Sequence, residues 1–300
     1  MSKDWESIFT TWSKSPSETE QDKMENAERG IKNAIQANSK LNSRNITVFT
    51  QGSYRNRVNV RKDSDVDIGI VCYDVFFPKY PDDNIKSMVE KNISDATYTY
   101  ETFKNEIEDA LVERFGRNSV SRGKKAFDIT ENSYRVEADV AAFFEHRRYT
   151  STNNYLSGVE MKPDDSNPPR IRNWPEQHYE NGVKKNKDTY RRYKKIVRIL
   201  KSLSNEMASN DISVAKSVPS FLIECLVWNT PNNIFDYSTL KSIVRNTLVF
   251  LYNNTGSYKT CSEWGEVSEL KYLFRDSQPW TREQANDFIL AAWNLSLIHI

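Results

Sequence analysis

The sequence contains little cysteine and histidine, with three residues of each in a chain of 300. The cysteines (Cys72, Cys225 and Cys261) are odd in number and far apart, which is typical of reduced cytoplasmic thiols and not of a disulfide framework. No cysteine and histidine spacing resembles a zinc site. There is no run of eighteen apolar residues, and the N-terminus lacks the apolar stretch of a signal peptide. We therefore expect a soluble cytoplasmic protein without a membrane-spanning segment.

An excess of charge of one sign is also absent, because the formal net charge of the chain is +1. A binding site for a polyanion must therefore be a local cluster of basic residues. Apolar residues make up 38% of the chain and aromatic residues 12%, which is enough for a globular protein. A length of 300 residues allows two lobes, each with its own core.

The two halves of the chain differ in their hydrophobic patterns. A capping box at residues 17–20 predicts the start of a helix, and residues 46–50 and 66–72 predict strands. Further along, the patterns predict a helix at 103–115, strands at 125–130 and 134–144, and helices at 190–207, 218–228, 240–252 and 281–292. The fold class is therefore predicted to be α+β in the first half and mainly helical in the second.

The expected domain boundary lies where proline-containing, loop-like sequence separates these halves. We predict a catalytic lobe at residues 1–160 and a helical lobe at 161–300, with an interlobe loop at 157–187. The N-terminal helix is expected to pack on both lobes.

Chemistry is concentrated in the stretch Gln51-Gly52-Ser53-Tyr54 and in the two acids Asp65 and Asp67. The small residues form a turn that can hold phosphate. On a strand, residues two apart point to the same face, so the two carboxylates can converge on divalent cations. Hard oxygen ligands suit Mg²⁺ or Mn²⁺. A triphosphate, a metal and a nearby hydroxyl are the ingredients of nucleotidyl transfer.

A third carboxylate should come from another strand, since two are seldom enough to hold two metal ions. Glu137 and Asp139 alternate onto one face of the predicted strand at 134–144 and are the two candidates. Asp139 lies in buried-strand sequence, where an unpaired carboxylate is costly and a metal partner is favourable. Two ions would activate the attacking hydroxyl and steady the leaving pyrophosphate.

Gly-Ser, eleven intervening residues and Asp-hydrophobic-Asp, followed by a distant strand carboxylate, resemble the polymerase-β-like nucleotidyltransferases. The segments Asn173-Trp174-Pro175-Glu176-Gln177-His178 and Pro219-Ser220-Phe221-Leu222-Ile223-Glu224 narrow the resemblance. They are similar to the bacterial cGAS/DncV-like nucleotidyltransferases (CD-NTases), the cyclic-oligonucleotide synthases of antiphage signalling systems (CBASS). The resemblance implies a polymerase-β-like core and a helical lobe, with the active site in the cleft.

The resemblance also implies roles for individual residues. Asp65, Asp67 and Asp139 would be the catalytic metal ligands for two Mg²⁺ or Mn²⁺ ions. The nucleotide-binding residues would be Gln51, Gly52, Ser53, Lys201, Lys216, Ser217 and Asn173. Lys201 matches the phosphate-contacting lysine of the family, and Lys216 or Ser217 is a weaker second candidate. Asn173 would read the edge of a nucleobase, since a carboxamide carries both a donor and an acceptor; the alternative is a turn-forming Asn before Trp-Pro.

The basic run at residues 184–201 has two interpretations. It carries nine lysine or arginine residues and one acid, Asp188. It is either a solvated helix face or a surface that contacts phosphate or RNA, and an activating RNA is one hypothesis for it.

We expect a monomer that makes a cyclic dinucleotide, containing pyrimidine or adenine, from NTPs. A downstream effector would sense the product without direct contact with the enzyme. Two alternatives stay open at this point: a template-independent RNA-tailing transferase, and a catalytically silent module that binds nucleotide or RNA.

Overall fold

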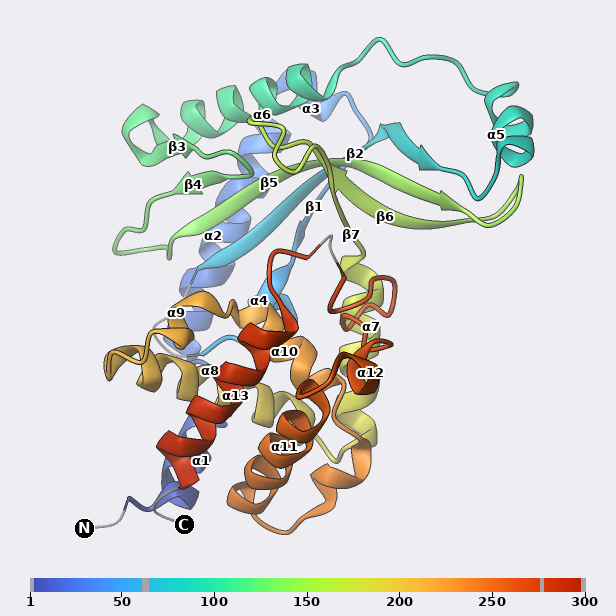
Figure 1. Ribbon diagram of the computed structural model, residues 1–300. Helices are drawn as coiled ribbons and strands as arrows, with labels where there is room; N and C mark the ends of the chain where they lie inside the picture. The colour runs from blue at the N-terminus through green and yellow to red at the C-terminus, as the bar shows by residue number, and fades with distance from the viewer. Residues whose placement is uncertain (1–2, 61–64, 276–277, 298–300) are drawn as a thin grey trace. The chain divides into compact units, whose positions relative to one another are not determined.

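The computed structural model of the chain describes residues 3–60, 65–275 and 278–297. The chain forms two compact units that are discontinuous in sequence. The helical unit comprises residues Met1–Pro16, Asn56–Asp63 and Glu176–Ile300, and the sheet unit comprises Ser17–Arg55 and Ser64–Pro175. Figure 1 labels the helices and strands of both units.

The sheet unit is built on a mixed sheet, which confirms the predicted α+β fold. Within the described residues its seven strands are β1 (Ile46–Thr50), β2 (Val66–Lys79), β3 (Val120–Arg122), β4 (Phe127–Ile129), β5 (Ala138–Tyr149), β6 (Tyr155–Met161) and β7 (Ile171–Asn173). Their order is β1-β2-β5-β4-β3, and β6 pairs with both β5 and β7. Only the central pair, β2 and β5, is parallel among these described strands. The first part of β5 pairs with β4 and its last part with β6, so β5 connects both regions of the sheet.

The helices of the sheet unit are α2 (Glu18–Ala37), α3 (Ser39–Asn42), α4 (Gly52–Arg55), α5 (Asp83–Glu90), α6 (Tyr100–Phe115) and the 3₁₀ helix η1 (Arg117–Ser119). The predicted capping box is present at the start of α2: the backbone N–H of Ser17 donates to Glu20 and that of Glu20 donates to Oγ of Ser17. The two orphan donors at this terminus are thereby satisfied, which stabilises the first turn.

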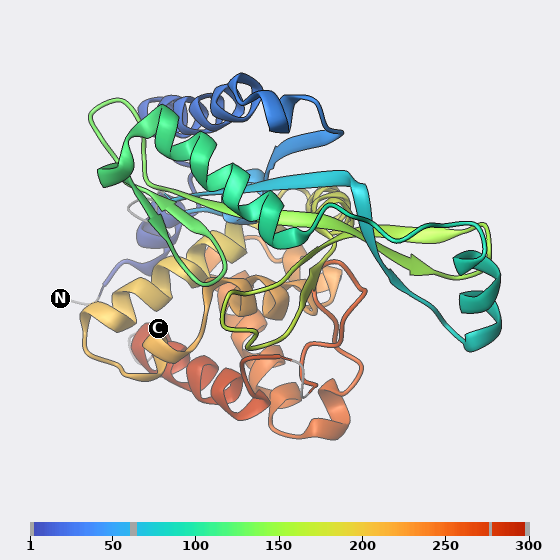
Figure 2. The ribbon, with the colours of Figure 1, turned by 90° about the horizontal axis from the view of Figure 1, so that it is seen from above.

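Helices α2 and α6 lie side by side over one face of the sheet (Figure 2). Phe103 of α6 stacks on Phe144 of β5 with ring centroids 5.5 Å apart. The hydroxyl of Tyr100 donates to the carbonyl oxygen of Ala142 over 2.8 Å. Because side chains alternate along a strand, Ala142 and Phe144 mark the helix-covered face, and the odd-numbered residues of β5 point to the opposite face.

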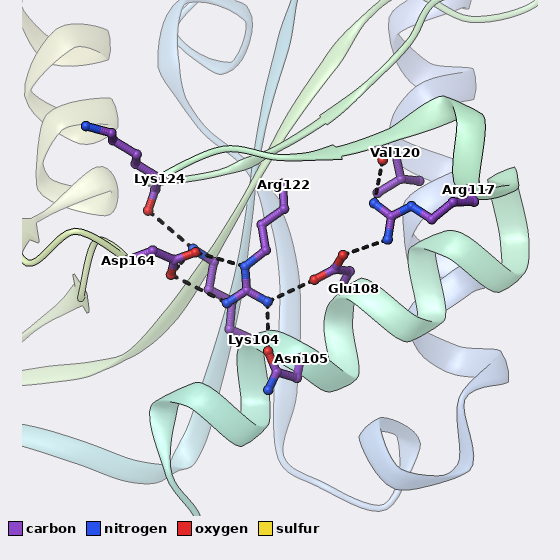
Figure 3. A network of polar contacts seen from close by, with 8 residues as sticks. All are labelled: Lys104, Asn105, Glu108, Arg117, Val120, Arg122, Lys124 and Asp164. Carbon is purple, nitrogen blue, oxygen red and sulfur yellow. Dashed lines mark hydrogen bonds and ion pairs between the residues drawn. The ribbon is translucent and has the colours of Figure 1, made fainter.

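A polar network ties α6 to β3 and to the loop between β6 and β7 (Figure 3). Nζ of the fully buried Lys104 lies 2.7 Å from Oδ1 of Asp164, and Nε of Arg122 donates to Oδ2 of Asp164 over 2.8 Å. Arg122 also pairs with Glu108, which in turn binds Arg117. The two cations lower the pKa of Asp164 even though its burial opposes this. The loop is thus fixed to the sheet unit at Asp164.

The helical unit comprises α1 (Trp5–Trp12), α7 (Pro175–Asp188), α8 (Tyr193–Ser209), α9 (Val214–Ser217), α10 (Ser220–Trp228), η2 (Asn232–Asp236), α11 (Leu240–Thr255), α12 (Tyr258–Cys261) and α13 (Arg282–Leu297). Its core includes Trp5 and Phe9 of α1 together with apolar residues of α8, α10, α11 and α13. The predicted division at 160/161 misses this contribution, because Trp5 and Phe9 lie more than 160 residues before the helices that bury them.

The prediction that residues 157–187 form a loop is wrong, because the structure places β6, β7 and most of α7 in this range. Pro175 is the first residue of α7, a position where a missing N–H costs nothing. The pair Asn181-Gly182, which resembles a turn, lies inside α7. The amide of Asn181 donates to the carbonyl oxygen of Val267 over 2.8 Å, so tertiary contact overrides the local preference. The predicted strand at 134–144 begins later, at Ala138.

Candidate active site

The site begins with the turn that follows the edge strand β1. Gly52 and Ser53 open the four-residue helix α4, and Gly52 has a positive φ of 63°. The backbone N–H of Gln51 donates to the carbonyl oxygen of Asp67 over 2.9 Å. A Cβ atom on Gly52 would lie 1.9 Å from Oδ2 of Asp67, so only glycine allows this approach. The phosphate-binding turn predicted from the sequence is therefore packed directly against one of the predicted acids.

The register of the central strands brings two of the predicted acids together. Asp67 of β2 and Asp139 of β5 are Cα partners in the parallel pair. Asp65 lies just before β2 and is exposed, whereas Asp67 and Asp139 are half-buried. Since Asp139 is an odd-numbered residue of β5, the pair lies on the face opposite α6.

The pKa of Asp139 is raised by its burial and by the acids around it. Burial and the carboxylates of Asp67, Asp128 and Asp65 raise the pKa of Asp139 to about 6. Desolvation and like charges both disfavour the ionised form of a carboxyl group. The rival candidate Glu137 is exposed and precedes β5. The structure therefore groups Asp139, and not Glu137, with Asp65 and Asp67.

The donor set fits a hard divalent cation. Burial and the like charges of Asp67, Asp128 and Asp65 disfavour the ionised form of Asp139, and a bound cation would favour that form. In the part of the chain that the structure describes, no group of three histidine, cysteine, aspartate or glutamate side chains is already arranged to hold a metal ion. The predicted Mg²⁺ or Mn²⁺ site with two ions stays a prediction.

Asn173 shares the face of the sheet that carries these acids. Glu145 follows Asp139 by an even number of residues along β5 and is therefore on the same face. Glu145 is the Cα partner of Val159 in β6, and Val159 is the partner of Asn173 in β7. Directly opposed residues of paired strands point to the same side. The carboxamide predicted to read a base thus lies on the face of the sheet that carries Asp67 and Asp139, which we call the active face. Arg172 points to the opposite, helix-covered face.

Lys201 belongs to the helical unit, where it is buried beside a carboxylate. Its Nζ lies 3.7 Å from Oε2 of Glu224 in α10, and Nε2 of His178 in α7 lies 2.9 Å from Oε1 of the same residue. Burial alone would raise the pKa of Glu224, but His178 and Lys201 outweigh it and hold the pKa below its ordinary value. The two motif segments that carry the family resemblance therefore meet at one buried cluster. The predicted contact of Lys201 with a triphosphate stays a prediction.

The second phosphate candidates lie on the short helix α9 of the same unit. Lys216 and Ser217 are both exposed. Nζ of Lys216 lies 4.0 Å from Asp211, and Oγ of Ser217 donates to the carbonyl oxygen of Val214 over 2.9 Å. Their predicted role in nucleotide binding also stays a prediction.

The basic run at 184–201 is divided between the core and the surface of the helical unit. Arg198 donates to the carbonyl oxygens of Ser13 and Arg57, and burial lowers its pKa to about 10. Nζ of Lys185 donates to the carbonyl oxygen of Thr230 over 2.7 Å. The exposed basic residues are Lys184, Lys187, Arg191 and Lys195. A surface for RNA would therefore consist of fewer charges than the sequence pattern suggests.

Two acids near these clusters escaped sequence reasoning. Asp128 of β4 is the Cα partner of Asp139 and forms a side-chain hydrogen bond with it. The alternation Phe127-Asp128-Ile129 is the signal that could have revealed it, since it places an acid between two buried residues. Glu224 belongs to the motif at residues 219–224, and nothing in its local sequence shows that it meets Lys201.

Comparison with known proteins decides the family. Residues 180–296 match the model of the cGAS/DncV-like nucleotidyltransferase C-terminal helical domain. The chain is 42% identical to the cyclic dipyrimidine nucleotide synthase CdnE of Cecembia lonarensis, over 98% of this chain and 99% of that protein. It is 45% identical to the cyclic dipyrimidine nucleotide synthase CdnE of Legionella pneumophila, over 98% of both chains. The chain belongs to the CD-NTase family.

The solved structure of the CdnE cyclic dinucleotide synthase of Elizabethkingia meningoseptica with GTP and Apcpp matches this CD-NTase with a TM-score of 0.79. The identity is 35%, and the match covers 97% of this chain and 98% of that one. The chain is therefore a nucleotidyltransferase with the fold of these synthases, as the motif at Gly52 and Asp65 predicts. No helix in the described ranges is long and apolar enough to cross a membrane.

Proposed function

We propose that this CD-NTase, a cyclic oligonucleotide synthase, joins two NTPs into a cyclic dinucleotide that contains pyrimidine. The observation that carries the proposal is the grouping of Asp67 and Asp139 in register, with Gly52 packed against Asp67. The synthases from Cecembia lonarensis and Legionella pneumophila, named for dipyrimidine products, favour pyrimidine over the adenine alternative. They also leave the RNA-tailing and catalytically silent alternatives without support.

The reaction is two successive nucleotidyl transfers. In each, a ribose hydroxyl oxygen attacks the α-phosphorus of an NTP, a new phosphodiester bond forms, and the bond to pyrophosphate breaks. The Gly52 backbone and Ser53 would hold the triphosphate, and Lys201 would contribute a positive charge to it. Lys216 or Ser217 would add a further contact, and Gln51 holds the turn to the strand of Asp67.

Asp65, Asp67 and Asp139 would hold two ions of Mg²⁺ or Mn²⁺. When bound there, divalent ions lower the pKa of the attacking hydroxyl and stabilise the charge on the leaving pyrophosphate. The in-register pair Asp67 and Asp139 faces the same side of the sheet as Asn173, which supports a nucleotide on this face that would use the acids for chemistry and the carboxamide for base reading.

A double substitution tests the proposed chemistry. Asp65→Asn with Asp67→Asn keeps the shape of both side chains and removes two negative charges, so the variant should fold and form no product. Incubation of the wild-type protein with the four NTPs and Mg²⁺, followed by mass spectrometry, identifies the product. If the folded double variant still made cyclic product, the assignment of these acids would be overturned.

Asn173→Ser tests base reading separately. The serine hydroxyl cannot present a donor and an acceptor in the geometry of a carboxamide, so the preference among NTPs should change while product formation continues. An unchanged product profile would discard this role for Asn173 and leave the proposed synthase activity intact.

The biological setting that we propose is antiphage signalling of the CBASS type, with a diffusible product sensed by an effector that need not touch this monomeric enzyme. An RNA activator would bind the exposed basic residues of the run 184–201. Added RNA should then raise the rate of product formation, and Lys187→Glu with Arg191→Glu should remove that increase. The same rate with and without RNA would exclude this mode of activation.

A further inference from the structure

Glu160 is a buried acid on the helix-covered face of the sheet, opposite the active face. The residue is fully buried in β6. Its Oε1 accepts from Arg170 over 3.0 Å and its Oε2 accepts from Nε of Arg172 over 3.0 Å. Nδ1 of the fully buried His146 lies 2.7 Å from Oε2. One carboxylate therefore connects β5, through His146, to both ends of the segment that leads into Asn173.

Strand β7 has little backbone pairing to hold it. It contains three residues, Ile171–Asn173, and pairs with β6 through three Cα partners. Among the described strands it has no other neighbour and is therefore an edge. Such a short edge strand depends on side-chain contacts for its position, and charge-assisted hydrogen bonds to a buried carboxylate are among the strongest of these.

The residue after β7 is fixed on the same side as Glu160. Trp174 packs edge-on against His146 with ring centroids 5.5 Å apart. A Cβ atom on Gly158 would lie 2.7 Å from Nε1 of Trp174, so the indole lies against the backbone of β6. Arg172 and Trp174 precede and follow Asn173 in the chain. Arg172 is held by Glu160, and Trp174 packs against His146 and the backbone of β6.

The loop before β7 is fixed at its other end by the network of Figure 3. Asp164 is bound there by Lys104 and Arg122. The segment that leads into β7 is therefore held at Asp164 by one ion-pair cluster and at Arg170 by a second. The Glu160 cluster is the one that adjoins Asn173.

We propose that Glu160 is a positioning residue for nucleobase selection, which fixes the Asn173 carboxamide by binding Arg170 and Arg172 on the far face of the sheet. The inference rests on the proposed base-reading role of Asn173. Glu160 itself touches no substrate in this scheme. A hydrogen-bonding site rejects the wrong base only while its donor and acceptor are held in place, so loosening β7 reduces discrimination before it reduces chemistry at Asp67 and Asp139.

A purely structural role for Glu160 makes a different prediction. Loss of a buried carboxylate would then lower the melting temperature and lower turnover equally for all NTPs. The ratio of kcat/KM for the preferred NTP to that for the least used NTP separates the two roles, because a uniform loss of active enzyme cancels in this ratio.

The test uses Glu160→Gln in the full-length protein, with Asn173→Ser measured beside it. Gln keeps the volume and one acceptor oxygen and removes the charge that holds two guanidinium groups. We expect the kcat/KM ratio to fall at least about tenfold, in the direction of the Asn173→Ser profile. Arg172→Lys, which keeps the charge and loses the Nε donor, should reduce the ratio as well and serves if Glu160→Gln does not fold.

Glu266→Gln is the matched control. Glu266 is a buried acid of the helical unit that accepts from Gln278 over 2.8 Å and lies 3.7 Å from Nζ of Lys271. Its loss removes a comparable buried charge pair that involves no residue of β7 or of the strands next to it, so the melting temperature should fall and the kcat/KM ratio should stay unchanged.

Each outcome decides between the proposals. A reduced ratio in Glu160→Gln or Arg172→Lys with an unchanged ratio in Glu266→Gln supports the positioning role. A second outcome is that Asn173→Ser alters the ratio but folded Glu160→Gln leaves it unchanged. This outcome overturns the positioning role alone, and Arg172→Lys takes the place of Glu160→Gln if the latter does not fold. If Asn173→Ser leaves the ratio unchanged, base reading by Asn173 fails and this inference fails with it, while product formation still supports the synthase.

Discussion

Replacement of Gly52 by alanine should lower activity mainly because it displaces the carboxylate of Asp67, and only secondarily because it destabilises the fold. The new methyl group would lie 1.9 Å from Oδ2 and 2.7 Å from Cγ of Asp67. Because the Gln51 N–H is bonded to the Asp67 backbone, the turn cannot withdraw without losing that hydrogen bond. The strand β2 is buried on both sides of this residue, at Val66 and Ile68. The carboxylate of Asp67 is therefore the group that must move.

The size of the effect follows from the distances. The carboxylate must move by about 1.5 Å to restore an ordinary contact, and a displacement of 1 Å or more at a reacting centre costs on the order of 100-fold in rate. The positive φ of 63° adds strain of about 1–2 kcal/mol to the folded state, because an L-residue with a Cβ disfavours that region.

Gly116 offers a matched control within the same unit. It has a φ of 85° at the end of α6, and a Cβ atom there would meet no heavy atom within 4 Å. Gly116→Ala therefore introduces backbone strain of about 1–3 kcal/mol without displacing any side chain. The two alanine variants should lose similar stability and differ only at Asp67.

The assay is pyrophosphate release from NTPs with Mg²⁺, together with thermal unfolding of each variant. We expect kcat of Gly52→Ala to fall about 100-fold and that of Gly116→Ala to stay within about twofold of the wild-type value. Equal activities of the two folded variants would refute the argument that the Gly52 turn sets the position of the Asp67 carboxylate.

Three further substitutions test the buried charges. Glu224→Gln should lower the free energy of unfolding by about 3–5 kcal/mol in urea titrations, since Lys201 is left buried without its carboxylate, and a loss below about 1 kcal/mol would contradict this. Asp164→Asn should lower the unfolding free energy by about 3 kcal/mol, since Lys104 is left buried, and an unchanged unfolding midpoint would show that its charge is satisfied elsewhere. Burial lowers the pKa of Lys185 from 10.5 to about 8, so between these pH values the unfolded chain binds more protons than the folded chain. The contribution of this group to stability therefore rises with pH across that window. Lys185→Met should remove this rise, and identical pH–stability curves for the variant and the wild type would refute the argument.

Local sequence was a reliable guide where the structure depends on neighbours in the chain. The strand at 46–50 has the predicted bounds, and the capping box at Ser17 and Glu20 forms as expected. Asp67 could be placed on a strand because buried apolar residues flank it on both sides. Capping and alternation act over a few residues, so they can be read without knowledge of the tertiary structure.

Features that depend on distant partners could not be predicted in this way. The cations Lys201 and Arg198 resemble exposed charges of a basic run, yet each is buried against a group far away in sequence, Glu224 and Ser13 respectively. Asp128 contacts Asp139 only because β4 and β5 are paired. Burial of a long cation is favourable only when a partner exists, and the identity of that partner is decided by the fold.

The placement of Asn173 shows how strongly function can depend on register. From Asp139 the active face continues to Glu145, crosses to Val159 and then to Asn173, and each step relies on the pairing of neighbouring strands. A shift of one residue in either pairing would move Asn173 to the helix-covered face and bring Arg172 to the active face. The bond between Arg172 and Glu160 opposes a shift between β6 and β7, and the contact between His146 and Glu160 opposes a shift between β5 and β6. The same buried carboxylate that binds Arg172 of β7 therefore also favours the register in which Asn173, and not Arg172, lies on the face that carries Asp67 and Asp139.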